Sequence, residues 1–308
     1  MTKTKTRKRR KNGDKTYVPF ILFCTVIPIV NFLVFYIYTN FSAFTMAFTD
    51  KDGTFTFDNF TRFFAELSLP SSDIRLAFVN TFLTFGILLL TFPFKVLVSY
   101  FIYKKIPGYN MYRIVFFIPM IIFSVAVSMV FMRLVSVDGV IAKWIGESME
   151  LGYTPDLLGD SRFANITVLL NMIWLSFPGD LIIWGGTFAR IPEDVLESGR
   201  IDGTTWWTEF TKITVPLVWP TVALQMVLMF CGIFGASGNV FLLTKGQYGT
   251  ITLNAWMYLQ LYENSGNQFT SNVFNYMSAV GLCISAVAIT ISLLIRRWTD
   301  KVFDEVEF

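Results

Sequence analysis

The segment from Ile191 to Pro220, IPEDVLESGRIDGTTWWTEFTKITVPLVWP, is the stretch of the sequence that says most about its fold. Pro192 suits the first position of a helix, where its missing N–H costs nothing, and two acidic residues follow where the helix dipole favours negative charge. Gly203 can adopt the left-handed conformation that ends a helix. A short amphipathic stretch at 206–213 comes next, and Pro216 then opens a long apolar run. The segment therefore predicts a helix–turn–helix that lies against a membrane and presents a small knob to a partner.

Long apolar stretches lie on both sides of this segment. The chain has 308 residues, of which 54% are hydrophobic and 15% charged, and its mean hydropathy is +0.54. A soluble domain carries about 25% charged residues, so this composition favours a chain that folds in lipid. A spanning helix needs about 20 mainly apolar residues. Candidate spans lie at 18–40, 76–103, 112–135, 164–188, 215–235 and 273–295.

These stretches predict an all-α fold, a polytopic transmembrane helical bundle with about six spans. A further apolar stretch at 253–262 is too short to cross a bilayer and is predicted to be interfacial or re-entrant. Along the chain we expect a basic tail at 1–17, a transmembrane domain at 18–300 and a C-terminal tail at 301–308. The loop at 190–214 connects the fourth and fifth predicted spans.

The distribution of Lys and Arg predicts the orientation of the chain. Eight of the 25 Lys and Arg residues lie among the first 15 residues; with the N-terminus inside, the inner segments hold 17 and the outer segments 7. Cytoplasmic segments of membrane proteins carry the excess of positive charge. We therefore expect a multi-pass protein of the inner or plasma membrane with both termini and the 190–214 loop in the cytoplasm. The basic tail is interpreted as an anchor to acidic membrane lipid rather than as a nucleic-acid-binding segment.

Several kinds of chemistry are excluded by what the sequence lacks. It contains no histidine, and its three cysteines, Cys24, Cys231 and Cys283, lie far apart. Histidine-based catalytic triads are therefore absent, and a metal site is disfavoured. There is no G-x-x-x-x-G-K-[ST] phosphate loop, so the chain is not expected to bind or hydrolyse ATP itself. We predict a protein that is not an enzyme and that holds no cofactor or metal of its own.

The loop at 190–214 resembles the EAA loop of binding-protein-dependent ABC importer permeases. Glu197, Ser198 and Gly199 stand where the family has Glu-Ala-Ala. Gly203 follows at the family's spacing, and Ile213–Pro216 matches the closing Ile-x-Leu-Pro with valine in place of leucine. Ser198 and Gly199 replace two alanines by residues that are also small. An ordinary connector would explain the capping residues but not the spacing of the closing motif.

The wider resemblance covers about residues 75–300 and is closest to sugar-importer permeases of the maltose and glycerol-phosphate type. It includes Asn80 and Thr81 at the start of the second span. It implies a type I importer permease fold and the translocation of a sugar or oligosaccharide. The partners it implies are a second homologous permease in a heterodimer, two cytosolic ATPase subunits that carry ATP and Mg, and an extracellular solute-binding protein. The residues that would couple to the ATPase are Glu197, Ser198, Gly199, Asp202 and Gly203.

The same resemblance places a substrate pocket near 171–180 and 237–239. A sugar site needs aromatic faces and a small number of hydrogen-bonding groups. The residues of these two segments that supply such groups are Asn171, Trp174, Ser176, Phe177, Asp180 and Asn239.

Lys95 and Asp180 are the charged residues that lie most clearly inside the predicted spans. A charge inside a membrane is costly and marks a functional position by default. Both spans run inward and place the two residues at a similar depth, so we expect them to face the protein interior and to pair. The alternative for Lys95 is a side chain that reaches along the helix to the inner membrane interface.

Three other functions fit parts of the sequence. An ABC permease for a non-sugar solute shares every feature above, because aromatic residues do not name the solute. An ion-coupled secondary transporter would also keep intramembrane charges, but it often shows internal repeats or paired discontinuous helices, and we find neither in the sequence. A membrane-embedded enzyme is disfavoured because histidine is absent and the carboxylates do not cluster.

Overall fold

The computed structural model describes residues 14–237, 239–262 and 271–302, and within them the regular secondary structure is helical apart from one isolated β-bridge. Helices long and apolar enough to cross a membrane are Pro19–Ala47, Asp73–Tyr103, Ser124–Ser148, Ala164–Phe188, Trp206–Cys231 and Asn272–Val302. This confirms the predicted all-α bundle with six spans. Most of the basic tail and the residues after Val302 lie outside the described residues.

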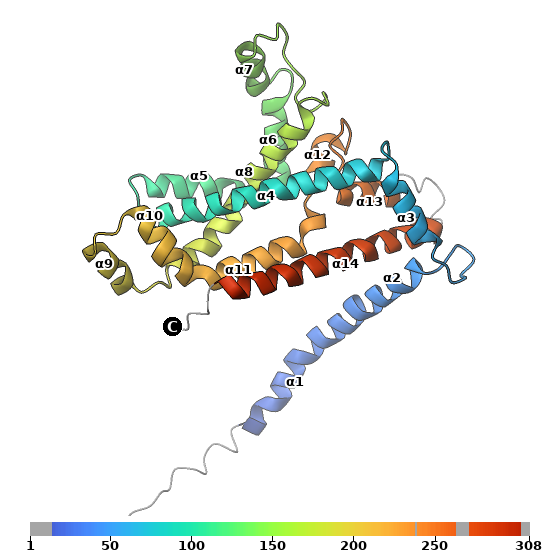
Figure 1. Cartoon of the computed structure of the whole chain (residues 1–308), viewed down its shortest axis with the longest axis horizontal. Helices are drawn as coiled ribbons and strands as arrows, with labels where there is room; N and C mark the ends of the chain where they lie inside the picture. The colour runs from blue at the N-terminus through green and yellow to red at the C-terminus, as the bar shows by residue number, and fades with distance from the viewer. Residues whose placement is uncertain (1–13, 238, 263–270, 303–308) are drawn as a thin grey trace, which may run out of the picture. The chain divides into compact units, whose positions relative to one another are not determined.

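The helices follow one another along the chain as the colours in Figure 1 show. Their bounds are α1 Asp14–Asn31, η1 Phe32–Tyr38, α2 Thr39–Ala47, α3 Asp58–Ser68, α4 Asp73–Tyr103, α5 Tyr109–Ile121, α6 Ser124–Val135, α7 Val140–Ser148, α8 Ala164–Phe188, α9 Glu193–Ile201, α10 Trp206–Thr208, η2 Glu209–Thr214, α11 Val215–Cys231, η3 Ile233–Gly235, α12 Val240–Thr244, α13 Leu253–Tyr262 and α14 Ser271–Val302. The chain divides into two compact units, residues 1–63 with 269–282 and residues 64–268 with 283–308.

In the first unit, α1, η1 and α2 form one continuous helix. The described chain buries no residue in the most apolar part of this helix. A helix that is apolar on all sides needs apolar surroundings, as the interior of a membrane provides. The span is longer than the predicted 18–40, because Asn40 stays helical and donates a hydrogen bond to the Tyr36 carbonyl at 2.7 Å. The Asn59 amide ends the helix by donating to the Ala47 carbonyl at 3.1 Å.

In the second unit, α4 and α8 pack along each other, and α5 lies against both (Figure 1). Ser72 caps the start of α4, where its Oγ accepts a hydrogen bond from the Arg75 N–H at 3.4 Å. The buried hydroxyls of Thr81 and Ser99 donate to backbone carbonyls one turn earlier in the same helix, at 2.8 and 2.7 Å. These bonds let α4 bury polar side chains in a membrane-spanning segment without leaving them unpaired.

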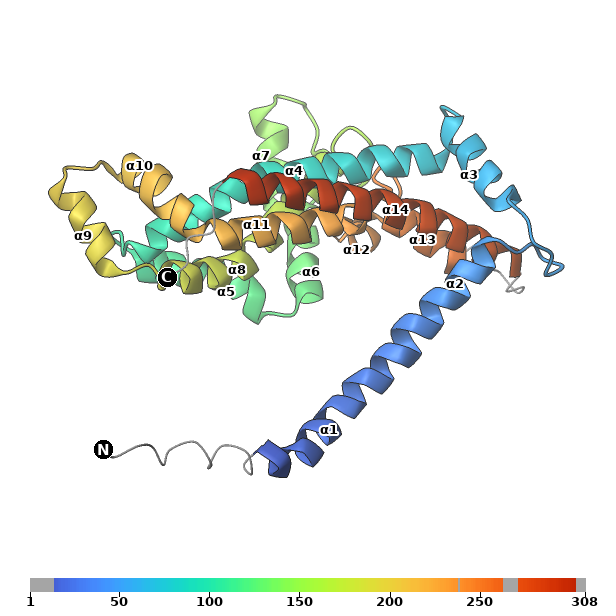
Figure 2. The same cartoon turned by 60° about the horizontal axis from the view of Figure 1, so that its bottom comes forward.

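The third predicted span, 112–135, is not a single helix. Ile122 and Phe123 leave the helical conformation between α5 and α6, and Figure 2 shows α6 crossing the direction of α5 steeply. The helix that meets the length and hydropathy of a span here is Ser124–Ser148. Pro119 weakens the end of α5 because it has no N–H to donate and its ring disturbs the preceding turn. The prediction of one continuous span was wrong because the residues at the break are as apolar as their neighbours.

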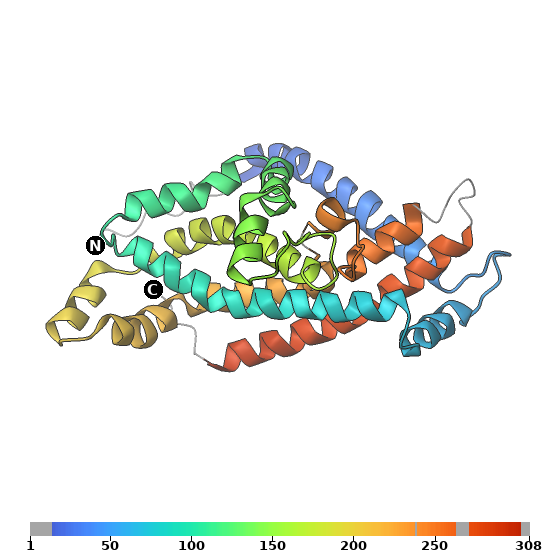
Figure 3. The same ribbon diagram turned by 90° about the horizontal axis from the view of Figure 1, so that it is seen from above.

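Two polar residues at the start of α4 fix the segment before α13. Asn80 Nδ2 donates to the carbonyls of Gly249 and Ile251 at 2.7 and 2.8 Å. Thr81 Oγ1 accepts a hydrogen bond from the Leu253 N–H at 2.8 Å. These bonds pair backbone groups that would otherwise be buried without a partner. The stretch predicted to be too short to span forms the 10-residue helix α13, and Figure 3 shows α12 and α13 at the opposite end of α4 from α9 and α10.

An exposed ion pair holds the loop that leads into α8. Arg162 Nη2 lies 2.6 Å from Asp160 Oδ2 and 3.2 Å from the Tyr153 hydroxyl oxygen. Hydrogen bonds from the guanidinium lower the pKa of the Asp160 carboxyl below its usual value. The aspartate therefore stays charged throughout the neutral range and keeps its hold on Arg162.

The fifth span begins earlier than the predicted 215–235. α10, η2 and α11 form one helix over Trp206–Cys231. Pro216 has no N–H to donate to the Lys212 carbonyl, and the helix widens into π turns over Glu209–Thr214 just before it. Pro216 therefore lies at the start of α11 as predicted, but the π turns before it join α11 to α10, so the span itself begins earlier.

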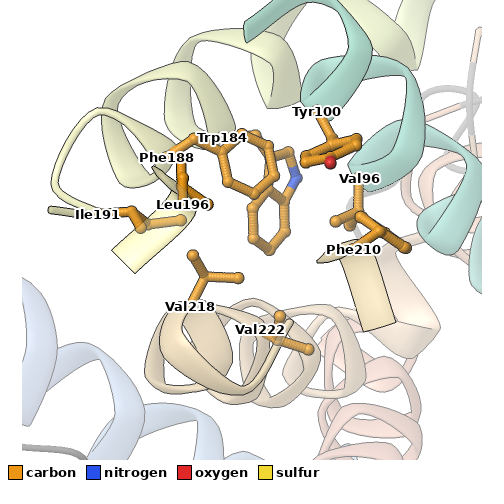
Figure 4. Close-up of a cluster of buried hydrophobic side chains, with 9 residues drawn as sticks. All are labelled: Val96, Tyr100, Trp184, Phe188, Ile191, Leu196, Phe210, Val218 and Val222. Atoms are coloured by element: carbon orange, nitrogen blue, oxygen red, sulfur yellow. The ribbon is translucent and has the colours of Figure 1, made fainter. Parts of the chain in front are cut away.

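We call residues 191–214 the stub. It is attached to the bundle by a cluster of buried apolar side chains, which are Val96, Tyr100, Trp184, Phe188, Ile191, Leu196, Phe210, Val218 and Val222. Figure 4 shows Trp184 at the centre of this cluster, with Leu196 and Phe210 reaching it from the stub. The ring centroids of Phe210 and Tyr100 lie 5.0 Å apart. Burial of a leucine or phenylalanine side chain contributes about 1.5–3 kcal/mol, so these contacts anchor the stub firmly.

Glu209 adds a polar attachment between the stub and α4. Its side chain is 5% exposed. The Tyr100 hydroxyl donates to Glu209 Oε1 at 3.1 Å, and the Lys104 ammonium forms an ion pair with the same oxygen. Buried charge is tolerated when it is paired and hydrogen-bonded, and here both partners come from the last turns of α4 and the residue after it. The stub therefore has an apolar and an ionic connection to one helix.

We expect Glu209→Gln to reduce the free energy of unfolding by about 1.5–3 kcal/mol, because the amide keeps the size of the side chain but removes the charge that Lys104 faces. Thermal unfolding of the purified protein in detergent measures this loss. Asp300→Asn changes an exposed carboxylate of α14 in the same way. That control should stay within about 0.5 kcal/mol of the unsubstituted protein.

A double-mutant cycle with Lys104→Met isolates the pair itself. The sum of the losses in unfolding free energy from the two single variants should exceed the loss from the double variant, because removing either partner already breaks the interaction. Strictly additive losses, or equal unfolding of Glu209→Gln and Asp300→Asn, would mean that this ion pair does not hold the stub.

Candidate functional site

The stub presents one face of α9 to the bundle and the other face outward. Four of the five predicted coupling residues are exposed: Glu197, Ser198, Asp202 and Gly203. The fifth, Gly199, is buried next to Leu196 on the inner face. Pro192 precedes the helix as its N-cap instead of occupying the predicted first position. The outward face of α9 is therefore short and polar. Pro192 lies at the start of the helix, and Gly203 follows its end.

Gly199 is closely packed between the two arms of the stub. A Cβ atom at this position would lie 2.8 Å from Ile213 Cδ1 and 3.3 Å from Thr204 Oγ1. The first distance is shorter than carbon atoms tolerate, so a larger side chain would require the end of the Ile213 side chain to move. The glycine weakens the helix by up to about 1 kcal/mol relative to alanine, and in return it lets the arms touch.

The turn after α9 forms a knob with an apolar tip. Gly203 has a φ of +73°, which confirms the predicted left-handed end of the helix. Its N–H donates to the Arg200 carbonyl at 3.1 Å. Ile201 at the tip is 87% exposed. Ile201 was not among the predicted coupling residues, although an isoleucine between charged residues at the end of a polar helix was a signal for it.

An ion pair joins α4 and α8 inside the membrane-spanning part of the bundle. Lys95 Nζ lies 2.8 Å from Asp180 Oδ2, and the side chains are 7% and 28% exposed. The predicted pairing is therefore confirmed, and Lys95 does not extend to the membrane interface. The Lys95 ammonium also lies 5.8 Å from the centre of the Phe177 ring. Pairing and partial burial let two charges stay in a segment where an isolated charge is costly.

A cavity of about 370 Å³ opens beside this ion pair, between α4, α8 and α11. Its lining residues are Leu88, Phe92, Lys95, Ser176, Asp180, Gln225, Leu228 and Met229. Two predicted substrate residues, Ser176 and Asp180, therefore share one cavity, and Phe177 is linked to it through Lys95. Gln225 was not predicted, although an amide within an otherwise apolar span was a visible signal. The cavity has apolar walls with a few polar groups, which is the usual composition of a small-molecule site.

The remaining predicted substrate residues lie elsewhere in the second unit. Trp174 packs against Phe131 of α6 with ring centroids 6.2 Å apart. Asn239 Nδ2 donates to Ser128 Oγ, also of α6, at 2.7 Å. Asn171 is fully buried, and neither its amide nitrogen nor its oxygen has a hydrogen-bond partner among the described residues. The six residues therefore do not form one site: three gather around Lys95, two contact α6, and Asn171 is separate.

The residues around the cavity can bind a ligand through hydrogen bonds and charged groups. Within the described residues there is no group of three or more His, Cys, Asp or Glu that could hold a metal ion. The carboxylate of Asp180, the Ser176 hydroxyl and the Gln225 amide can each exchange hydrogen bonds with a hydroxyl-rich ligand. The arrangement is therefore suited to recognising a polar solute.

A described protein family and several named transport permeases match most of this chain. The family described as "Binding-protein-dependent transport system inner membrane component" matches residues 78–304. The maltose/maltodextrin transport system permease protein MalF of Vibrio vulnificus is 27% identical over 258 residues, which are 79% of this chain and 47% of that protein. The multiple sugar-binding transport system permease protein MsmF of Streptococcus mutans is 21% identical over 279 residues, which are 90% of this chain and 93% of that protein. The chain thus spans about half the length of MalF and nearly all of MsmF.

A solved structure shows the same fold. It is a bacterial alginate ABC transporter in complex with an alginate pentasaccharide-bound periplasmic protein, and one of its chains aligns with a TM-score of 0.78 at 21% identity. The alignment covers 97% of this chain and 100% of that chain. The family match includes the stub and nearly all of the helices that line the cavity. This multi-pass membrane protein therefore belongs to the family of binding-protein-dependent transport system inner membrane components.

Proposed function

We propose that this chain is the membrane-spanning permease subunit of an ATP-driven importer, which translocates a sugar or oligosaccharide delivered by an extracellular binding protein. The observation that carries the proposal is the stub. Its outward face is free, while its inner face is joined by the apolar cluster and Glu209 to α4, α8 and α11. These are the same three helices that line the cavity beside Lys95 and Asp180. Movement imposed on the knob would therefore reach the walls of the cavity directly.

The energy for this movement would come from separate subunits. The sequence has no phosphate-binding loop, so ATP and Mg would be held by two cytosolic ATPase subunits. The exposed residues of α9, together with the apolar tip at Ile201, form the surface that we assign to contact with one of them. Closure of the ATPase subunits would move the stub as a rigid lever and switch the permease between inward-open and outward-open states.

The other proposed partners follow from the distribution of charge and of uncovered apolar surface. The excess of Lys and Arg in the segments on the stub's side favours a cytoplasmic stub and cytoplasmic termini. In the first unit, the apolar surface of the helix from α1 to α2 is where we place a second, homologous permease in a heterodimer. The extracellular binding protein would deliver the solute from the opposite side, and the family description supports such a partner.

The proposed substrate class rests on the cavity and on the names of the relatives. MalF and MsmF are named for the transport of maltose, maltodextrin and multiple sugars. In this chain, Ser176, Asp180 and Gln225 would bind sugar hydroxyls, and Phe177 would offer a ring face. Trp174 and Asn239 would line the path of the sugar further along the same bundle, whereas the fully buried Asn171 would not contact it in this conformation.

We expect Gly203→Val to reduce ATP-driven uptake at least tenfold. A β-branched residue in the left-handed conformation is strained by about 1–2 kcal/mol, so the turn would relax and move the knob. Gly53→Val is a matched control, because Gly53 has a φ of +75° and, like Gly203, no atom within 4 Å of an added Cβ. Uptake and the amount of protein in the membrane should both be measured, and the control should retain at least half of the uptake.

Ile201→Asp tests the same surface without straining the backbone. Because Ile201 is almost fully exposed, its replacement should leave the fold intact and reduce co-purification of the ATPase subunits at least fivefold. Full uptake and full co-purification in both Gly203→Val and Ile201→Asp would contradict the coupling role of the stub.

The ion pair gives a prediction about the cavity. We expect Asp180→Asn and Lys95→Met each to lower the amount of folded protein in the membrane, because each leaves one charge without its partner in a membrane-spanning segment. The double variant should restore that amount to near the original level. Its uptake of maltose or lactose, whichever sugar the unsubstituted importer accepts, should remain at least tenfold lower, since the groups proposed to bind sugar hydroxyls are changed.

Glu147→Gln serves as the control for these variants, because Glu147 is an exposed carboxylate outside the cavity. Unchanged uptake by the double variant at equal protein amounts would remove Asp180 and Lys95 from the proposed substrate path. Uptake that persists after deletion of all partner ATPase genes would instead favour an ion-coupled transporter over the ATP-driven importer.

A further inference from the structure

A second cavity of about 260 Å³ lies between the ends of α4, α5 and α8, at the end of α4 that carries the stub. It is distinct from the cavity beside Asp180, and the proposed transport mechanism does not use it. Its polar lining residues are Ser99, Tyr103, Lys105, Tyr109 and Arg113. We propose that this cavity binds the phosphate headgroup of an anionic phospholipid from the membrane leaflet on the side of the stub.

The charged residues that line the cavity are all positive. Lys105 and Arg113 both line it, and no acidic residue does. Neither side chain forms an ion pair within the described part of the chain. The neighbouring Lys104 behaves differently, because it is paired with the buried carboxylate of Glu209. Two adjacent lysines therefore have separate environments, and the one at the cavity keeps its charge available for an anion.

The backbone of the α4–α5 turn produces this separation. Lys105 has a φ of +54°, a left-handed conformation that is uncommon for a residue other than glycine. Lys105 lines the cavity, whereas Lys104 does not. Gly108 then caps α5 in a left-handed conformation with a φ of +81°, and Arg113 lies in the second turn of that helix. The positive end of the α5 dipole is therefore close to the two cations and adds to the attraction for a negative group.

The rest of the lining supplies donors and space. The phenols of Tyr103 and Tyr109 can donate hydrogen bonds to phosphate oxygens. On the α8 side the wall contains Gly185 and Gly186, and a Cβ atom added at either glycine would meet nothing within 4 Å. Two consecutive glycines thus leave open a volume that side chains would otherwise reduce.

The position of the cavity favours a lipid over free phosphate. It lies at the end of the apolar α4 span, at the level where tyrosine, lysine and arginine are enriched in membrane proteins. Beside the cavity, α5 exposes a row of apolar side chains, which includes Met111, Ile114, Val115 and Ile118. Acyl chains attached to a headgroup in the cavity can lie along this row, whereas inorganic phosphate would gain nothing from it. Basic pockets between membrane helices are known to suit anionic headgroups.

Native mass spectrometry of the purified importer, titrated with phosphatidylglycerol or phosphatidylcholine, tests the proposal. We expect the unsubstituted protein to bind phosphatidylglycerol at least tenfold more tightly than phosphatidylcholine. Lys105→Gln combined with Arg113→Gln should remove this preference. Gly186→Leu should reduce binding at least tenfold without any change in charge, because it fills the cavity, and Gly185→Leu provides a second filling variant should the first fail to fold.

The control is Arg296→Gln combined with Arg297→Gln, which removes two exposed cations near the end of α14. It should leave phosphatidylglycerol binding within twofold of the unsubstituted protein, and millimolar inorganic phosphate should not displace the lipid. Equal binding of the two lipids, unchanged binding in the cavity variants, or displacement by inorganic phosphate would overturn the proposal. None of these results depends on transport activity.

Discussion

A short stub is attached firmly to the membrane helices, and this attachment determines how a movement of the knob can reach the bundle. Glu209 is buried between Tyr100 and Lys104, and the apolar cluster around Trp184 surrounds that contact. The helix that ends next to Lys104 also carries Lys95, which lies nine residues before Lys104, or about 13 Å along a helix. A single rigid element thus connects the stub with the charged cavity. Without the attachment, the knob would be a loop whose movements stay local.

The membrane imposes a second constraint, since polar groups must find partners within the protein. α4 satisfies it in three ways along its length: Asn80 pairs with backbone carbonyls at one end, Lys95 pairs with Asp180 in the middle, and Lys104 pairs with Glu209 at the other end. Each bond ties α4 to a different part of the second unit. The helix is therefore apolar enough to cross a membrane and also organises polar contacts of the unit.

Much of this arrangement follows from the sequence, and the exceptions have physical causes. Gly203 predicted the turn after α9, because few other residues adopt a positive φ at low cost. The lengths of the apolar runs predicted most of the spans. The break between α5 and α6 at Ile122 could not be predicted from the sequence, because the residues there are as apolar as those that continue a helix. The burial of Glu209 also could not be predicted, since its partner Lys104 lies more than a hundred residues earlier. Gln225 went unnoticed because one amide in an apolar run can face lipid, protein or a cavity.

We propose that the exposed knob of α9 contacts a nucleotide-hydrolysing partner. Site-specific crosslinking from Ile201→Cys, in a chain whose three native cysteines are replaced by serine, measures that contact most directly. In membranes that contain the assembled importer, the cysteine should crosslink to an ATPase subunit and should resist a membrane-impermeant thiol reagent added from outside. A cysteine that reacts from outside, or that crosslinks to no ATP-hydrolysing protein, would contradict the account.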